Sequence, residues 1–147
     1  MVGRMIVTEI GKVESDGTPP IRLKIHEEFW DASINVHHFS HLIVLWWISE
    51  KDSLENRGNL ADIPPTQGAE KSGIFASRSP NRPSPIGHTI VKLLGVDEES
   101  NSLLIDHLDA FDGTPIIDIK PYLPSSDRVD DTKVPPWFED LKKRYTN

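Results

Sequence analysis

The sequence predicts a mainly β protein whose short strands curl into a barrel or a strongly curved sheet. Three observations carry this prediction. Residues 21–26 alternate apolar and polar side chains, as a half-buried strand does. Residues 42–48 form a continuous apolar run, which is typical of a strand buried on both faces. Residues 89–96 and 102–106 flank a turn-like stretch, and the two segments predict a hairpin.

The other strands and loops follow from local residue types. β-rich residues at 5–10, 73–76 and 115–119 predict three more strands. Residues 14–20 carry the Gly and Pro of a turn. Residues 51–72 are polar and have no periodicity, so we expect a long loop of the kind that is often functional.

Helical patterns are scarce. A short helix is expected over 27–35, and a second one at the C-terminus, where Pro135 or Pro136 can open it. The apolar face of this second helix is formed by residues spaced four apart, namely Trp137, Leu141 and Tyr145. The chain has 147 residues and fits one domain, 1–147, in which residues 128–147 form a peripheral helical segment.

Composition limits the classes of protein that fit. The chain has no cysteine, which excludes disulfides and thiolate metal sites. Its longest apolar run is seven residues, whereas a membrane helix needs about 20. No signal peptide is evident at the N-terminus, so we expect a soluble cytoplasmic protein with no membrane partner.

The charge is unevenly distributed along the chain. The formal net charge is −7, which by itself argues against a nucleic-acid partner. Residues 71–96, however, contain four basic side chains and no acidic one: Lys71, Arg78, Arg82 and Lys92. A basic patch on an acidic body can receive phosphate, although uneven sampling of surface charge explains the window equally well.

The densest motif covers residues 73–88, Gly-Ile-Phe-Ala-Ser-Arg-Ser-Pro-Asn-Arg-Pro-Ser-Pro-Ile-Gly-His. Its prolines stiffen the backbone, and proline cannot donate to a sheet ladder. A stiff loop that displays Arg78 and Arg82 is suited to hold an anion, because each guanidinium is a planar fork of donors. The simpler interpretation is a loop that merely connects two strands.

A second motif covers residues 108–124. Asp112-Gly113 predicts a tight turn, and Asp109, Asp112 and Asp118 are candidates to bind the ribose hydroxyls or the amino group of a nucleoside. Alternatively, Asp112 only caps its own turn. The tetrapeptide Asp-Gly-Thr-Pro occurs at 112–115 and also at 16–19, a repeat that we attribute to chance unless both turns reach the same site.

Two further groups of residues favour structural roles. His37, His38 and His41 include an i, i+4 pair that could bind a metal in a helix, but no carboxylate completes a metal-binding pattern, so no metal site is predicted. Trp46 and Trp47 lie in the apolar run, where core packing is favoured over base stacking.

Together these motifs resemble the signature of the TsaA-like (TrmO-type) family. The family pairs Gly-Phe-Ala-Ser/Thr-Arg-Ser with Arg-Pro-Asn-Pro-Ile-Gly, and Asp-Gly-Thr-Pro with Asp-Ile-Lys-Pro-Tyr. Phe39-Ser40-His41-Leu42 is a further point of resemblance, and the similarity covers most of residues 3–127. The long blocks make it far more specific than a lone glycine motif. No Gly-x-Gly-x-x-Gly follows a strand, so a doubly wound methyltransferase is not supported.

The resemblance implies a single-sheet β-barrel that binds S-adenosylmethionine near a homodimer interface, without a metal. It also implies methylation of N6 in N6-threonylcarbamoyladenosine, beside the anticodon in the anticodon loop of a tRNA. The implied cofactor-binding residues are Arg78, His88, Leu108, Asp109, Asp112, Gly113, Thr114, Ser49 and Glu50.

Roles in the reaction are less constrained. Asp112, Asp118 and Tyr122 are candidate proton acceptors, since the attacked nitrogen loses a proton. Arg82 and Lys120 are candidate substrate-binding residues. One alternative is a non-catalytic sensor or interaction module that binds S-adenosylmethionine; another is a methyltransferase that acts on a different small or nucleotide substrate.

The sequence departs from the family pattern at several points. Ser84 stands where the family usually has Asn, and His88 stands where an apolar residue is expected. Many bacterial members have Pro-Arg-Gln near residues 18–21 and His-Gln at the position of Ser49-Glu50.

Overall fold

The computed structural model describes residues 1–144. The chain divides into two compact units. The first, here called the sheet unit, comprises Met1–Trp47 and Gly87–Tyr122. The second, the loop unit, comprises Ile48–Ile86 and the described part of Leu123–Tyr145.

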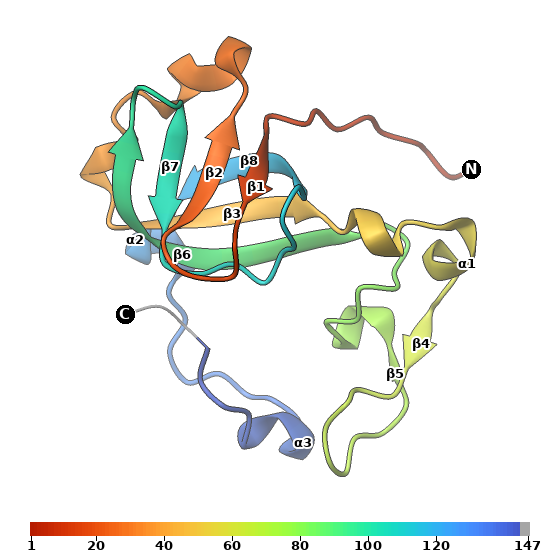
Figure 1. Cartoon of the computed structure of the whole chain (residues 1–147). Coiled ribbons are helices and arrows are strands. Elements are labelled where there is room, and N and C mark those ends of the chain that lie inside the picture. The colour runs from red at the N-terminus through yellow and green to blue at the C-terminus, as the bar shows by residue number, and fades with distance from the viewer. Residues whose placement is uncertain (145–147) are drawn as a thin grey trace. The chain divides into compact units, whose positions relative to one another are not determined.

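Six antiparallel strands make up the sheet unit (Figure 1). They are β1 (Gly11–Glu14), β2 (Ile21–Ile25), β3 (His41–Trp47), β6 (Ile86–Asp97), β7 (Ser102–Ile105) and β8 (Pro115–Pro121). Their order is β1-β2-β7-β6-β3-β8, and β8 pairs again with β1, so the strands form a ring.

The register of this ring places the apolar side chains on its inner face. Val13 pairs with Leu23, and Leu23 pairs with Leu103; all three are fully or almost fully buried. On β3, Leu42 and Val44 are buried while Ile43 is only half-buried. The strand therefore buries one face, and the expectation that 42–48 is buried on both faces is wrong.

One close approach requires glycine. A Cβ atom on Gly87 would fall well inside the contact distance of the Trp46 indole ring. The Trp46 Nε1 donates to Thr89 Oγ1 at 3.3 Å, and Trp46 packs on the core. This is the core role predicted for that tryptophan, and only a residue without a side chain fits beneath its ring.

Two 3₁₀ helices of the sheet unit lie between β2 and β3: η1 (Glu27–Ser33) and η2 (Val36–His38). Asn35 separates them with a φ of 67°, a left-handed conformation that Asn tolerates better than most residues. Phe29, Val36 and Phe39 pack against the core from this segment. The helix expected over 27–35 is thus present, in 3₁₀ form.

The loop unit has little regular structure. It contains η3 (Ser49–Lys51), α1 (Leu54–Arg57), a two-stranded sheet of β4 (Ala61–Asp62) and β5 (Ser72–Gly73), η4 (Ile74–Ala76), α2 (Pro124–Asp127) and α3 (Pro136–Glu139). None of the helices among the described residues is both long and apolar enough to cross a membrane.

The prediction of a mainly β chain with a few short helices is confirmed, and so is the hairpin of β6 and β7. The strand expected over 5–10 is wrong, because pairing starts only where Ile10 donates to Ile116. The strand expected over 73–76 is mostly a 3₁₀ turn. The C-terminal helix is a single turn opened by Pro136, and Tyr145 lies outside the described residues.

Candidate functional site

The two Asp-Gly-Thr-Pro turns meet in the sheet unit. Residues 16–19 connect β1 to β2, residues 112–115 lead into β8, and β1 pairs with both of those strands. The backbone N–H of Ser15 donates to Asp112 Oδ1 at 2.9 Å, and that of Gly113 donates to the Val13 carbonyl at 2.7 Å. Both copies of the tetrapeptide therefore reach the same site, so we no longer attribute the repeat to chance.

Each turn is stabilised by its own residues. Gly17 and Gly113 have φ angles of 92° and 81°, which glycine adopts without strain. Asp16 Oδ1 accepts from the Thr18 hydroxyl at 2.7 Å and from the Thr18 N–H at 2.9 Å. These bonds favour the ionised carboxylate, so the Thr18 hydroxyl and then the Thr18 amide lower the pKa of Asp16.

A pocket of about 370 Å³, here called the turn pocket, opens between these turns. It is lined by residues of β1, the first turn, β2 and the second turn: Glu14, Ser15, Asp16, Thr18, Pro19, Pro20, Arg22 and Asp112. Three of them are carboxylates and one is a guanidinium.

The single guanidinium of the turn pocket is already paired. Arg22 Nη1 lies 2.9 Å from Asp97 Oδ2, and this hydrogen bond, with those from Ser100, lowers the pKa of Asp97 to about 2. Because Asp97 engages the charge of Arg22, the field inside the turn pocket is dominated by carboxylates. Such a pocket suits a ligand that carries positive charge and hydroxyl donors.

The stretch 108–114 alternates between core and surface. Leu108, Ala110 and Thr114 are buried, whereas Asp109, Phe111 and Asp112 are exposed. The buried side chains fix the backbone, so the exposed ones are presented on a rigid support. Of the residues predicted here, Asp112 lines the turn pocket, and Gly113 forms the turn that carries it.

The other predicted cofactor contacts fall into different parts of the chain. His88 is exposed on β6, in the sheet unit. Ser49, Glu50 and Arg78 are exposed in the loop unit, Ser49 and Glu50 within η3. Each unit is compact in itself, and the turn pocket is built entirely from the sheet unit.

Arg82 has a distinctive environment within the loop unit. Its guanidinium donates to three backbone carbonyls, those of Ser77 at 3.0 Å, Ser79 at 3.2 Å and Ile74 at 3.4 Å. The same loop is tied by Ser79 Oγ, which donates to Asp62 Oδ2 at 3.0 Å. The side chain predicted to bind substrate is therefore engaged with its own loop.

The predicted residues of β8 lie elsewhere in the sheet unit. Lys120 Nζ lies 2.8 Å from Asp118 Oδ2, and this ion pair raises the pKa of Lys120. Asp118 Oδ1 also accepts from the Ile119 N–H at 2.9 Å. Tyr122 is half-buried, and its backbone N–H donates to the His41 carbonyl. None of these three residues lines the turn pocket.

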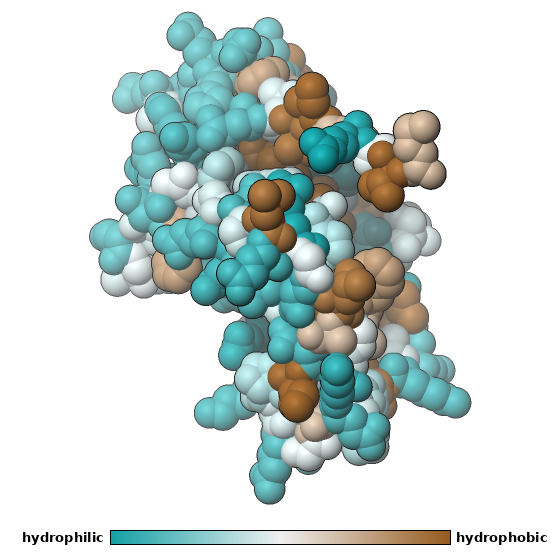
Figure 2. Space-filling view, turned by 90° about the vertical axis from the view of Figure 1, so that its right-hand side faces the viewer, coloured by the Kyte–Doolittle hydropathy of each residue, from teal (hydrophilic) through white to brown (hydrophobic). Residues whose placement is uncertain are grey.

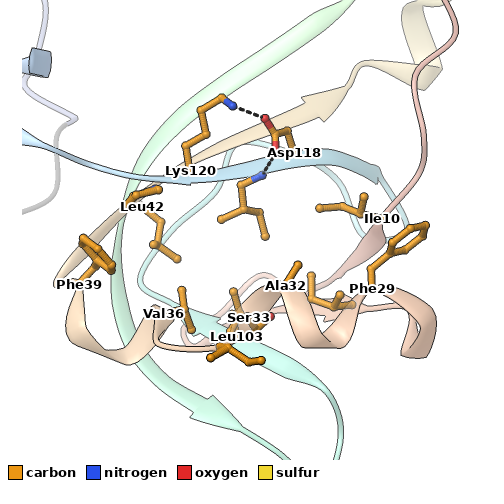
Figure 3. A pocket seen from close by; sticks show the side chains of 14 residues that line it. Ile10, Phe29, Ala32, Ser33, Val36, Phe39, Leu42, Leu103, Asp118 and Lys120 are labelled. Carbon is orange, nitrogen blue, oxygen red and sulfur yellow. Dashed lines mark hydrogen bonds and ion pairs between the residues drawn. The ribbon is translucent and has the colours of Figure 1, made fainter.

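Asp118 and Lys120 instead lie at the rim of a second pocket, of about 360 Å³, here called the apolar pocket. Figure 3 shows their ion pair on one side of β8 and the apolar side chains Ile10, Val36 and Leu103 on the other. Its lining is apolar except for Ser33, Asp118 and Lys120.

The histidines considered as metal ligands are dispersed over two elements. His37 and His38 stack in η2 with ring centroids 4.1 Å apart, whereas His41 starts β3 with its Nδ1 2.7 Å from Ser40 Oγ. No group of three or more His, Cys, Asp or Glu side chains within residues 1–144 is arranged to hold a metal ion.

Most of the polar lining of the turn pocket was not predicted from sequence. Glu14, Ser15, Asp16 and Thr18 belong to a segment that the sequence identifies only as a turn. The repeated tetrapeptide Asp-Gly-Thr-Pro could have identified these residues from sequence. It occurs twice in the chain, and residues of both copies line this pocket.

The fold and the site define a class: a mainly β protein whose polar pocket is built from turns at strand ends. A family model described as the N-terminal domain of tRNA-methyltransferase O matches residues 14–128. The chain belongs to this family.

Individual relatives agree with this assignment. A probable S-adenosyl-L-methionine-binding protein of Archaeoglobus fulgidus is 41% identical over 120 residues, which cover 82% of this chain and 31% of that protein. A tRNA (adenine(37)-N6)-methyltransferase of Mus musculus is 34% identical over 107 residues, 73% of this chain and 24% of that protein. The crystal structure of TrmO from Pseudomonas aeruginosa aligns with a TM-score of 0.68 and 26% identity, covering 89% of this chain and 62% of that one. The chain thus spans less than two thirds of each of these relatives.

Proposed function

We propose that this protein is an S-adenosylmethionine-dependent methyltransferase that methylates N6 of N6-threonylcarbamoyladenosine, next to the anticodon of tRNA. The observation that carries the proposal is the convergence of the two Asp-Gly-Thr-Pro turns on one acid-lined pocket. Membership of the TrmO family supports it, as does the similarity to a mouse protein named for methylation of adenine 37 of tRNA.

The turn pocket fits S-adenosylmethionine in its charge and in its hydrogen-bond acceptors. That molecule carries a sulfonium and an ammonium group, together with two ribose hydroxyls. Glu14, Asp16 and Asp112 supply acceptors for the ammonium and the hydroxyls, and negative charge that favours the sulfonium. Phe111 is 67% exposed beside Asp112 in sequence, and its ring is available to stack on an adenine. When bound, S-adenosylmethionine supplies an electrophilic methyl group.

The other predicted cofactor contacts are His88 in the sheet unit and Arg78, Ser49 and Glu50 in the loop unit. All four side chains are exposed, as ligand contacts must be in the free protein. The backbone of residues 108–114 is held by the buried Leu108 and Thr114, so it can approach the cofactor without rearrangement.

Proton transfer is assigned to a carboxylate of the chain. Formation of the N–C bond at the carbamoylated nitrogen releases one proton. Asp112 is exposed and anchored through Oδ1 by Ser15, which leaves Oδ2 to accept that proton directly or through water. Asp118 is weaker in this role, because Lys120 and the Ile119 amide already occupy its two oxygens. Tyr122 is the third candidate.

The substrate-facing charges follow from the environment of Arg82. Since its guanidinium is used within its own loop and Arg78 is assigned to the cofactor, the exposed cations of the basic window that remain are Lys71 and Lys92. We assign phosphate contacts of the anticodon loop to this group, because charge-assisted contacts to phosphate position RNA without reading its sequence. Arg82 then supports the loop that carries Arg78.

The decisive experiment uses methyl-labelled S-adenosylmethionine and two pools of tRNA, one carrying threonylcarbamoyladenosine and one prepared without that modification. We expect label only in the modified pool, and digestion should place it in the threonylcarbamoylated nucleoside. Label in both pools would indicate another nucleotide substrate. Glu99→Gln serves as the control for Asp112→Asn, since both carboxylates are exposed in the sheet unit and Glu99 does not line the turn pocket.

A second candidate function is a sensor that binds S-adenosylmethionine without transferring its methyl group. It is favoured by the Archaeoglobus relative, which is named only for binding. Calorimetry distinguishes the two: saturable cofactor binding with no label in either tRNA pool supports the sensor.

A further inference from the structure

Residues 1–8 of the sheet unit form an arm that extends away from its strands (Figure 1). Within the described residues, no strand pairing involves this arm. It is nevertheless apolar: Met5 is 91% exposed and Ile6 is 99% exposed, and Met1, Val2 and Val7 are exposed as well. Figure 2, which views the side toward which the arm extends, shows apolar side chains standing out among hydrophilic ones.

Two properties of the arm indicate that it has a partner. Its residues from Met5 onward are strand-forming types, yet they pair with nothing in the described chain. Several large apolar side chains that remain in water side by side are unusual for a surface with no binding role.

The base of the arm is fixed, and this sets its direction. Glu9 Oε2 lies 2.9 Å from His26 Nε2, and the Ile10 N–H donates to Ile116 at 2.9 Å. A return of the arm onto its own unit would need a reversal at Thr8-Glu9, where the sequence offers neither Gly nor Pro.

The apolar pocket begins at the same base, because Ile10 is part of its wall. Its floor is formed by the core residues Ile25, Leu42 and Leu103, and η1 and η2 form the opposite wall. A volume of 360 Å³ equals about a dozen waters at ~30 Å³ each, and an apolar lining gives such waters few hydrogen-bond partners. The lining of the pocket therefore favours an apolar occupant over water.

We propose that the arm of one copy of this chain fills the apolar pocket of a second copy, and that the exchange is reciprocal. Each chain carries one unpaired apolar arm and one apolar pocket, so a two-fold arrangement covers both surfaces on both chains. An extended arm of eight residues spans up to ~26 Å, which is sufficient to cross to a neighbouring subunit. The exchange is independent of methyl transfer.

The first test compares the oligomeric state of matched variants by sedimentation at micromolar concentration. Deletion of residues 1–8, or the double variant Met5→Asp/Ile6→Asp, should raise the dimer dissociation constant about tenfold or more, because the buried apolar area is lost. The control Gly3→Asp/Thr8→Asp adds the same charge to the arm and keeps both apolar side chains. It should remain closer to the unaltered chain.

The second test fills the pocket. Ala32→Trp places an indole at the pocket wall and should also produce monomers, whereas Ala76→Trp adds the same side chain to an exposed position of the loop unit and should not. Circular dichroism and thermal unfolding verify that each variant is folded.

Complementation gives the sharpest test. Arm-deleted chains retain a pocket, and Ala32→Trp chains retain an arm, so a mixture should form heterodimers although each variant alone does not dimerise. The dye 8-anilinonaphthalene-1-sulfonate should fluoresce more with the arm-deleted chain than with the intact dimer, because its apolar pocket is open.

Three results would overturn the proposal. A monomeric intact chain whose dye signal rises on arm deletion means that the arm fills its own pocket. An arm-deleted chain that still dimerises as tightly as the intact chain places the interface elsewhere. Equal dye signals with no complementation mean that a small apolar ligand, rather than the arm, is the occupant.

Discussion

The two signature stretches, 73–88 and 108–122, are both rigid, but they are held in different ways. In the first, the side chain of Arg82 holds the backbone by donating to the carbonyls of its own loop. In the second, strand pairing and buried side chains hold the backbone, with Leu108 and Thr114 inside the sheet unit. A conspicuous charged residue can therefore be part of the scaffold, while a short carboxylate such as Asp112 lies at the pocket.

This difference has a consequence for function. Where strands supply the rigidity, an exposed side chain such as Asp112 keeps a polar atom available to a ligand. Where the side chains of a loop hold its own backbone, as Arg82 does, those side chains are already hydrogen-bonded within the loop. Arg78 and Arg82 are thus not equivalent, although both belong to the same basic window.

The largest expected effect is at the junction of the first stretch with β6. Gly87→Ala would place a methyl group against the Trp46 indole and displace it from the core, lowering stability by about 1–3 kcal/mol. Gly95→Ala on the same strand meets only Leu104 Cδ1 at 3.6 Å and should change stability little. Thermal unfolding of both variants measures the contrast; equal losses would mean that the Trp46–Gly87 contact is not limiting.

Variants of Arg82 test whether this side chain holds the backbone of the first stretch. Arg82→Ala leaves three carbonyls without their donor and should cost about 1–3 kcal/mol of stability, with cofactor affinity and methylation falling together. Arg78→Ala should weaken cofactor binding about tenfold. Arg82→Lys should recover only part of the stability, since an ammonium cannot span the same carbonyls. If Arg82→Ala were as stable as the unaltered chain and lost tRNA methylation but not cofactor affinity, Arg82 would be a substrate-binding residue.

Asp112→Asn removes the negative charge of this side chain in the second stretch while keeping its hydrogen bond to the backbone. The amide oxygen can still accept from the Ser15 N–H, so the fold should persist. Affinity for a cationic ligand should fall about tenfold, because a charge-assisted contact becomes neutral. Calorimetry with S-adenosylmethionine gives the affinity, and Glu99→Gln, at an exposed carboxylate outside the turn pocket, is the control. An unchanged affinity would place the cofactor outside the turn pocket.

The smallest effect concerns the ion pair that neutralises Arg22. The pKa of Asp97 is lowered to about 2 in the folded chain, below the unfolded value of about 4. Its contribution to stability is therefore complete above about pH 4 and is lost as pH falls through 2. Urea unfolding across this range should show the stability of Asp97→Asn converging with that of the unaltered chain at the acid end. Glu99→Gln, an exposed neighbour, should show no such convergence.

Local sequence determined much of this protein. Alternation at 21–26, the apolar run at 42–48 and the turn between 89–96 and 102–106 identified the strands correctly, because each depends on neighbours in the chain. The long motif blocks identified the family for the same reason. The burial of β3 on one face could not be deduced, since an apolar run does not reveal which of its side chains point into the ring.

Strand propensity without a partner was the main source of error. Residues 5–10 have the composition of a strand, but a strand exists only where another segment offers hydrogen bonds, and pairing begins at Ile10. Residues 73–76 turn into a 3₁₀ helix at the point where the loop of Arg82 begins.

The sequence by itself predicted five of the six ring strands, the family and the residue types that a nucleoside cofactor would need. Only the tertiary structure decided which of the residues of those types lie in the same pocket. Asp16 and Asp112 are about a hundred residues apart and are united because β1 pairs with both β2 and β8. Arg82, in contrast, is engaged by carbonyls of its own loop, the farthest of them eight residues away in sequence. Pairing partners and hydrogen-bond acceptors are properties of three-dimensional proximity, and no pattern of residue types along a chain specifies them.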